Sequence, residues 1–456
     1  MYRWVRGRHE LSLRSRGFME APWAGGVVLL ACVVVAMLLA NLPGTKHYYH
    51  NLLETDLSIV VHSPSGLIDW VFPDGMTVEK FINDCLMVVF FFTVGLEIKR
   101  EVINGQLSSV RKAILPVLAA AGGMIAPALI FGIFNHGTLA ANGWGIPTAT
   151  DIAFAVGILS MLGDRVPVSL KIFLTALAIA DDLGAILVIA LFYGGELQLG
   201  LLVIALLIMV GVWVLYHMGE KRMGFYLVPA VVVWGLFYYS GVHATLSGVA
   251  MAMLIPMEPR YSREYFVHKM RWLKEHLLAS EATEEEFPNE EDRFCLRQMS
   301  QLCSRSVGMS YRLEHALTPY VTFLIMPVFA LANAGVEITS LEYINIFQFS
   351  PEIGSVGMGV FFGLLVGKPL GIFIASWIAV KSKLAVMPEG ATWRMLLAVA
   401  CLGGIGFTMS LFVDSLAFVD PGLIDRGKIA ILMGSTAAAV ARSVLILLFS
   451  KKTVQR

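Results

Sequence analysis

Apolar runs about as long as a membrane is thick recur along the whole 456-residue chain. A helix of about 20 apolar residues crosses a hydrocarbon layer about 30 Å thick. Hydrophobic residues make up 57% of the chain and charged residues only 15%, whereas soluble proteins carry about 25% charged residues. The chain is therefore predicted to be an all-α polytopic membrane protein. Its formal net charge is zero, which gives no indication of a nucleic-acid partner.

The hydropathy pattern predicts about twelve transmembrane helices. An even number leaves both termini on one side, and the basic segments 1–21 and 451–456 place that side in the cytoplasm. The apolar run after the Arg-rich start is predicted to be an uncleaved first span, because it is long and no small-residue cleavage site follows it. The predicted spans cover residues 22–42, 84–98, 113–134, 147–162, 170–193, 197–216, 225–239, 243–255, 319–338, 354–380, 395–416 and 426–449.

Two polar inserts divide this pattern. The first eight spans lie in 22–255 and the last four in 319–450. Within the first block, residues 43–80 contain two β-prone runs around a Pro-Ser-Gly turn, which predict a periplasmic β-hairpin. Residues 256–318 are dense in charges of both signs. We expect them to form a solvated and partly disordered cytoplasmic loop without a catalytic constellation.

Two adjacent acids, Asp181 and Asp182, lie near the middle of the span predicted at 170–193. A charge at mid-membrane costs about 2.5–3.5 kcal/mol, so it indicates a function. The alternative is that both side chains are protonated and serve only packing. We disfavour it, because neighbouring helical residues diverge by about 100° and would need separate partners.

Two more ionisable residues, Lys368 and Asp151, fall near the middle of predicted spans. Lys368 lies at the centre of its span between Gly367 and Pro369, too deep for its ammonium group to reach the interface. A buried lysine favours a carboxylate partner, and Asp181 or Asp182 could supply it.

Helix breakers accompany the charges in both halves of the chain. Asp151 follows "GIPTAT", and this context predicts an acid in the first turn of a helix that begins after a break. The segment "LGGIGFTMSLF" at 402–412 is interrupted in the same way by its glycines. Two broken spans, one in each half, indicate a transporter site at mid-membrane.

Six motifs occur in the order and at about the spacing of one transporter family. They are "TATDIAFAVG", "LAIADDLGAILVIALFY", "SGVHATLSG", "FALANAGV", "GKPLG" and "GGIGFTMSLF". With them, nearly all of residues 20–255 and 312–450 resemble the NhaA-type Na⁺/H⁺ antiporters of bacterial inner membranes. The resemblance implies inverted-topology repeats with two broken, crossing helices, and pH-regulated, electrogenic exchange of Na⁺ or Li⁺ for H⁺. No cofactor is implied, and we expect a homodimer in the lipid bilayer.

The resemblance also implies roles for individual residues. Asp182 matches the principal cation-binding carboxylate, and Asp181 its proton-exchanging neighbour, which pairs with the lysine that Lys368 matches. Thr150 matches a candidate oxygen ligand of the transported Na⁺, and Asp151 the acid that compensates the crossing helix ends. Positions tied to pH regulation near the cytoplasmic funnel match Glu97, Arg100, Glu101, His243, Glu314 and His315.

The chain departs from the family pattern in two places. Thr318 stands where a histidine often occurs, and the loop 256–311 is much longer than usual. Both departures bear on pH dependence more than on transport chemistry.

The residues themselves suggest a mechanism for exchange. Na⁺ is a hard cation that favours oxygen ligands, so two carboxylates, a hydroxyl group and backbone carbonyls suit it. Protons and Na⁺ would then compete for the same oxygens. If only a protonated or a Na⁺-loaded site can change its accessibility, this competition becomes obligatory exchange.

Two other classes of protein are weighed against this prediction. A Na⁺-coupled symporter of similar fold would need a roomy polar cavity for its organic solute. An intramembrane aspartyl protease needs two acids that face each other from different spans. Adjacent Asp181 and Asp182 cannot do this, and no motif around Asp151 and Asp182 would position a peptide.

Overall fold

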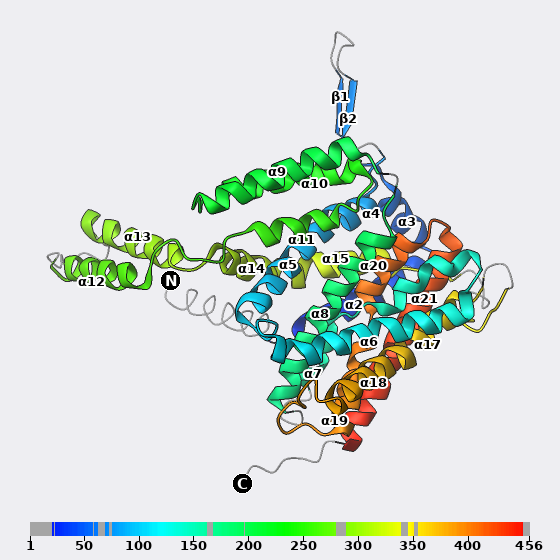
Figure 1. The fold of residues 1–456 in the computed structure, drawn as a ribbon. Helices are drawn as coiled ribbons and strands as arrows, with labels where there is room; N and C mark the ends of the chain where they lie inside the picture. Colours follow the sequence, from blue (N-terminus) through cyan, green and yellow to red (C-terminus); the bar gives the residue numbers. More distant parts are fainter. Residues whose placement is uncertain are drawn as a thin grey trace, which may run out of the picture.

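The protein is described from a computed structural model, which is a bundle of helices with one small hairpin (Figure 1). The structure describes residues 21, 23–57, 59–62, 69–72, 75–161, 167–195, 197–279, 289–338, 345–350 and 354–449. The basic terminal segments 1–20 and 451–456 lie outside the described residues.

The first half of the chain runs from α2 to α11. Its elements are α2 (Ala24–Asn41), α3 (Lys46–Glu54), β1 (Ile59–His62), β2 (Asp69–Phe72), α4 (Val78–Phe81), η1 (Ile82–Leu86), α5 (Met87–Asn104), α6 (Val110–Asn135), η2 (Leu139–Thr148), α7 (Ile152–Met161), α8 (Val168–Phe192), α9 (Leu199–His217), α10 (Gly224–Ser240) and α11 (Thr245–Leu254). The second half contains α12 (Arg263–Ala279), α13 (Glu290–Arg305), α14 (Met309–Tyr320), η4 (Val321–Ile325), α15 (Met326–Asn333), α17 (Val356–Phe362), η5 (Gly363–Gly367), α18 (Lys368–Lys381), α19 (Trp393–Gly403), α20 (Phe407–Ala417) and α21 (Pro421–Phe449).

Within the described residues, seven helices are long and apolar enough to cross a membrane. They are Ala24–Asn41, Val78–Asn104, Val110–Asn135, Val168–Phe192, Leu199–His217, Met309–Asn333 and Val356–Lys381. The pair α19 and α20, bent by 46°, adds an eighth candidate span if the two helices cross the membrane together. The prediction of a helical polytopic membrane protein is confirmed. Each of the twelve predicted spans coincides with a helix, but α7, α10 and α11 are short, and the count of twelve stays a prediction.

The start of the ninth predicted span is wrong by ten residues. The helix begins at Met309, inside the segment predicted to be a charged loop, and runs through η4 to Asn333. Its first turns carry Arg312 and Glu314, which lower the local hydropathy although Leu313 and Glu314 are both buried. The mean hydropathy of a stretch of residues does not show that one face of this turn is buried in the protein.

The charged insert is also more ordered than expected. Residues 263–279 and 290–305 form α12 and α13, which pack as a pair around Leu273, Cys295 and Leu302. Apolar residues at helical spacing supply this small core, and charge density alone conceals it. In Figure 1 the pair projects from the body of the molecule beside α14.

A two-stranded hairpin lies in the first insert. Strands β1 and β2 are antiparallel, with Ile59 opposite Phe72 and His62 opposite Asp69. The Pro-Ser-Gly turn between them lies outside the described residues. The hairpin extends away from the helices at the top of the view in Figure 1.

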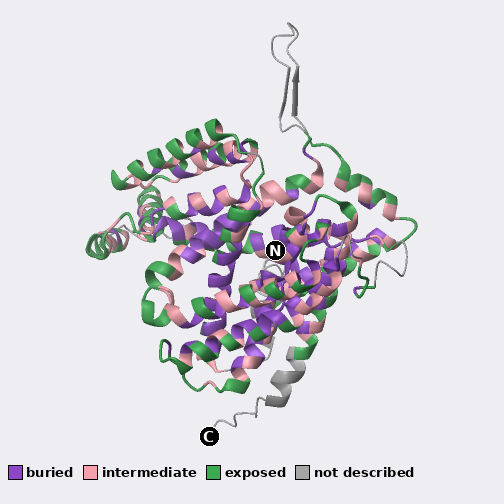
Figure 2. Ribbon diagram, turned by 45° about the vertical axis from the view of Figure 1, so that its right-hand side comes forward, coloured by how far each residue is buried: buried purple, intermediate pink, exposed green. Residues whose placement is uncertain are grey.

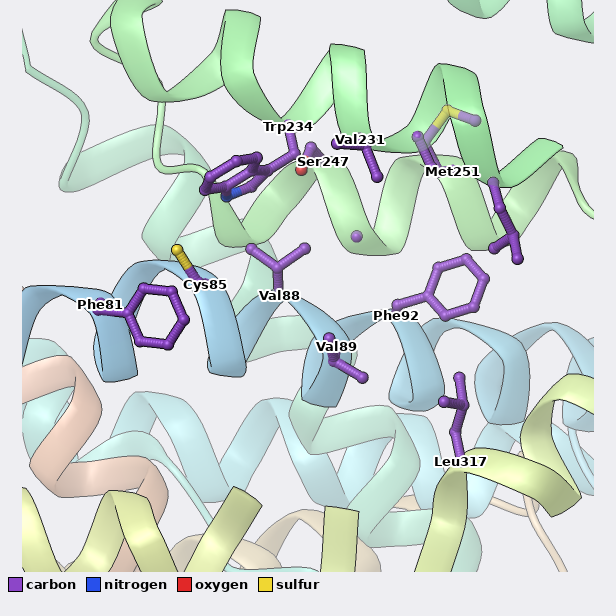
Figure 3. Close-up of a pocket in the computed structure, with 13 residues that line it drawn as sticks. Phe81, Cys85, Val88, Val89, Phe92, Val231, Trp234, Ser247, Met251 and Leu317 are labelled. Carbon is purple, nitrogen blue, oxygen red and sulfur yellow. The ribbon is translucent and has the colours of Figure 1, made fainter. Parts of the chain in front are cut away.

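Buried residues concentrate in the middle of the helix bundle, as the purple ribbon in Figure 2 shows. The main apolar core joins α2, α5, α6, α8 and the helices from α15 to α21. A smaller core joins α9, α10 and α11 to one face of α5. Between α10, α11 and α5 lies an apolar pocket of about 520 Å³, lined by Phe92, Trp234 and Met251 among others (Figure 3). The charged residues discussed below all lie outside this pocket.

Candidate ion-binding site

Two broken helices meet at the centre of the main core. η2 ends at Thr148 and α7 begins at Ile152, while α19 ends at Gly403 and α20 begins at Phe407. The breaks are joined directly, because Asp151 N–H donates to the Ile405 carbonyl at 2.8 Å. Thr150 Oγ1 also donates to the Gly403 carbonyl at 3.1 Å. The proline and glycines in these segments explain why neither helix continues through the break.

Asp151 caps the N-termini of both half-helices. Its Oδ1 accepts from Phe154 N–H at 3.0 Å, and its Oδ2 accepts from Thr408 Oγ1 at 2.5 Å and Thr408 N–H at 3.3 Å. Helix N-termini carry partial positive charge and unpaired N–H groups, which a carboxylate stabilises. Asp151 is therefore the N-cap of α7 and not, as predicted, an acid within its first turn, and the same carboxylate also caps α20.

Lys368 lies at the other side of this break, at the C-terminal end of η2. Its Nζ donates to the Thr148 carbonyl and, at 2.6 Å, to Asp181 Oδ2. The π-helical turn η5 immediately precedes Lys368 and Pro369 follows it. Because Pro369 has no N–H for the carbonyl four residues earlier, the widened turn is the local response to the proline. The lysine side chain is completely buried.

The structure selects Asp181, of the two acids, as the partner of Lys368. Asp181 Oδ2 also accepts from Thr150 Oγ1 at 2.5 Å. Thr150, expected as a Na⁺ ligand, therefore donates to Asp181 in this state. The other carboxylate oxygen, Asp181 Oδ1, is buried without a partner among the described residues.

Asp182 points elsewhere, as the angular separation of neighbouring helical residues requires. It lines a cavity of about 140 Å³ between α2, α5, α7 and α14–α15, which we call the site cavity. Within the described part of the chain, no hydrogen bond or ion pair involves the Asp182 carboxylate. The polar residues that line the site cavity with it are Thr93, Glu97, Thr150, Asp151, Thr318 and Thr322.

Four of the six residues expected to regulate pH dependence form one cluster. Arg100 pairs with Glu314, and its guanidinium lies 3.6 Å from Glu97 and 3.5 Å from Glu101. The cluster joins the end of α5 to the start of α14. Because Glu97 also lines the site cavity, the cluster is contiguous with it. His315 is adjacent to Glu314, but its ring stacks on Tyr311.

His243 does not lie near this cluster, contrary to the expectation. α5 and α11 run parallel: Gly248 packs on Val88, and Lys99 donates to the carbonyls of Met253 and Ile255. His243 precedes α11 and so lies toward the opposite end of α5 from Arg100. There its ring pairs with the Tyr193 carbonyl.

Sequence reasoning missed Thr408, whose hydroxyl and amide both donate to Asp151. The signal was present, because a hydroxyl residue directly after the "GGIG" break can satisfy an acid that caps the same helix end. Thr318, noted only as a departure from the family pattern, lines the site cavity and donates to the Glu314 carbonyl at 2.7 Å.

Replacing Thr408 by valine tests the joint between the half-helices. The variant loses one donor to a fully buried carboxylate, so we expect a loss of about 1–3 kcal/mol in stability. Thr408→Ser keeps the donor and is the matched control. Thermal unfolding in detergent measures both variants, and equal midpoints for valine and serine would contradict the assignment.

Known proteins are similar to this chain over nearly its whole length. Residues 16–446 match the family model described as Na⁺/H⁺ antiporter 1. The chain belongs to the Na⁺/H⁺ antiporter 1 family. It is 41% identical over 429 residues to the Na⁺/H⁺ antiporters NhaA of Shigella dysenteriae and of Escherichia coli O139:H28, covering 93% of this chain and 95% of each relative.

Membership of the Na⁺/H⁺ antiporter 1 family confirms the resemblance drawn from the six motifs. It also confirms that the protein is a transporter and not an enzyme. A solved structure, the sodium proton antiporter MjNhaP1 of Methanocaldococcus jannaschii, aligns with a TM-score of 0.50 at 11% identity, covering 96% of this chain and 99% of that one. That likeness concerns the fold alone.

Proposed function

We propose that the protein is a secondary Na⁺/H⁺ antiporter that extrudes Na⁺ or Li⁺ from the cytoplasm in exchange for external protons. The observation that carries the proposal is the Asp182 carboxylate, which is buried, lacks a protein partner in the described residues and faces a small cavity. A carboxylate in that position needs a proton or a cation. Family membership supports the choice of ions.

In this proposal the two acids have different tasks. Asp182 is the principal Na⁺ ligand, because its oxygens face the site cavity. Asp181 binds Na⁺ only when its ion pair with Lys368 opens, and Thr150 can then turn its hydroxyl oxygen to the cation. Asp182 can release a proton as Na⁺ enters. A second proton can leave the Lys368 ammonium group when its ion pair with Asp181 opens, so more than one H⁺ would exchange for one Na⁺. Transport would then be electrogenic.

The broken helices supply a means of alternating access. Asp151 and Lys368 neutralise the N-terminal and carbonyl ends of the two breaks, so the half-helices can stay inside the membrane while the surrounding helices move. We propose the inverted-repeat, twelve-span arrangement in a bacterial inner membrane, with both termini in the cytoplasm. The homodimer expected from the sequence stays a prediction.

The Arg100 cluster is proposed to regulate transport with pH. Its carboxylates share one guanidinium and Glu97 reaches the site cavity, so protonation of the cluster would change the charge at the cavity entrance. The cluster also joins α5 to α14, so a change in its charge would alter how these two helices are held together.

Neither competing class fits the site as well. A cavity of about 140 Å³ is small beside the roughly 300–1,000 Å³ of sites for organic ligands, which disfavours a solute symporter. A protease would need Asp151 free to share a proton with Asp182, but both oxygens of Asp151 accept hydrogen bonds from helix ends.

Reconstitution of the pure protein tests the proposal directly. We expect addition of Na⁺ or Li⁺ to collapse an imposed pH gradient across proteoliposomes, with an apparent Na⁺ affinity that falls as the pH falls. The reason is competition, because protonated carboxylates cannot bind the cation. Choline chloride is the control for ionic strength. A Na⁺ affinity independent of pH, or Na⁺-driven uptake without proton movement, would overturn the proposal.

A further inference from the structure

A second buried acid lies outside the site described above. Asp414, near the end of α20, is completely buried, and both of its oxygens lack a hydrogen-bond partner among the described residues. α21 covers it closely, because a Cβ at Gly427 would collide with the Asp414 carboxyl group. A buried carboxylate with no donor is unfavourable by several kcal/mol, so its presence calls for a function.

The groups that act on Asp414 electrostatically come from α21 and from the end of α8. They are Lys428, Asp425 and the hydroxyl of Tyr193. The elements η2 and α15 also pack against α20 but contain no titratable residue. Burial decreases outward along this group, since Asp414 is 0% exposed, Lys428 is 8% exposed and Asp425 is partly exposed. Of these charged residues, Asp414 and Lys428 are therefore buried, and Asp425 reaches the surface.

That surface is opposite the Arg100 cluster. Asp425 is near enough to His50 and Glu337 for their charges to act on it. Glu337 follows the end of α15, at the far end of the span Met309–Asn333 from Glu314. The residues from Glu314 to Asn333 extend about 28 Å along a helix, so the two charged groups lie at opposite ends. Glu337 also pairs with Lys46, and its carboxylate lies 3.9 Å from His50.

Asp414 is also connected to the central site through α20. It lies six residues after Thr408, or about 9 Å along the helix, and the Thr408 hydroxyl donates to Asp151. Between them, Ser410 Oγ donates to the Ile146 carbonyl of η2 at 2.8 Å. Asp414 and the broken-helix crossing are therefore joined by the single helix α20. A change of charge at Asp414 that shifts α20 would also shift the crossing.

We propose that Asp414 is an outer proton site, which takes up H⁺ from the face that carries Asp425 and, through the resulting change in its charge, sets the rate of the transport cycle. In the uptake step, a proton leaves the Asp425 carboxyl group or a water molecule and forms an O–H bond on Asp414. The Asp414 negative charge disappears, and Lys428 offsets that charge whenever the proton has left. The inference rests on the proposed antiport, in which protons enter from the outer side.

An infrared measurement tests the proton itself without any transport assay. Acid-minus-alkaline difference spectra of the purified wild type should contain the carbonyl stretch of a buried, protonated carboxylic acid, and this band should be missing from Asp414→Asn. Asp420→Asn is the matched control, because Asp420 is an exposed acid in the next loop on the same face. A wild-type spectrum without any band that Asp414→Asn removes would overturn the proposal.

A transport measurement tests the coupling. In proteoliposomes, Asp414→Asn should still exchange Na⁺ for H⁺, but it should lose most of the dependence of the rate on the pH of the outer compartment. Asp420→Asn should keep the wild-type dependence. An unchanged profile in Asp414→Asn would contradict the outer-site role. Loss of the outer-pH dependence together with a stability equal to or above wild type would support it, because a packing role would predict a loss of stability.

If the wild type shows the band but no exchange of Na⁺ for H⁺, the proposed function fails while the assignment of a protonated Asp414 stands. The two hypotheses are thereby distinguishable in one preparation.

Discussion

Replacing Asp182 by asparagine is expected to abolish Na⁺/H⁺ exchange. Asp182 is the acid that faces the site cavity, and no protein group shares its oxygens among the described residues. Asparagine has nearly the same shape but offers the cation one neutral oxygen in place of a carboxylate, and it cannot exchange a proton. A loss of about 3 kcal/mol in Na⁺ binding corresponds to roughly a 100-fold weaker affinity. Na⁺-driven collapse of a pH gradient in proteoliposomes is the measurement.

The fold of the Asp182→Asn variant should be intact, since no ion pair or hydrogen bond of the described residues is lost. Its unfolding midpoint in detergent should therefore match the wild type or exceed it. Asp292→Asn, on the exposed insert helix α13, controls for loss of an acid far from the site. Exchange at near wild-type rates in Asp182→Asn would refute the assignment of the principal ligand.

Composition was enough to predict the fold class, and isolated charges were enough to predict where the site lies. Asp151, Lys368 and the adjacent pair Asp181 and Asp182 are each set in an apolar run, and all four residues lie around the crossing of the two broken helices. The reason is energetic: a charge inside the membrane is costly, so it is found mainly where it has a function. Their residue types and depth are therefore readable without a structure.

The sequence did not determine the contacts between helices that are far apart in the chain. It could not decide whether Lys368 pairs with Asp181 or Asp182, because that choice depends on how α8 is rotated against α18. Nor could it place His243 away from Arg100, since only the parallel packing of α11 on α5 decides it. The insert helices α12 and α13 were not predicted, because only three buried side chains form their core and the many charges around them hide that pattern.

The rotation of α8 directs Asp181 toward Lys368 and Asp182 toward the site cavity. The two adjacent acids therefore have different roles, which the sequence alone does not distinguish. The charge of Asp181 is offset by Lys368, and its Oδ2 accepts a hydrogen bond from Thr150, so it needs no bound cation. Asp182 has no such partner and faces the cavity, so it is available to ions. Each residue therefore has its own expected phenotype, and the ion pair gives the second large prediction.

Replacing Lys368 by methionine should destabilise the protein strongly. Methionine keeps the length of the side chain but leaves Asp181 buried with only the Thr150 hydroxyl as donor. Removing one member of a buried ion pair costs about 3–5 kcal/mol. Lys381→Met, at the exposed end of the same helix α18, should change stability by less than about 0.5 kcal/mol. Thermal unfolding of purified protein in detergent measures both.

A double variant decides whether the loss comes from the stranded charge. Asp181→Asn removes that charge, so Lys368→Met/Asp181→Asn should be more stable than Lys368→Met alone. We expect a coupling between the two sites of about 0.5–3 kcal/mol. Because the double variant keeps Asp182, its residual Na⁺ binding measures what that carboxylate contributes alone. Additive effects of the two substitutions would show that Lys368 stabilises the Thr148 carbonyl end of the broken helix and not Asp181.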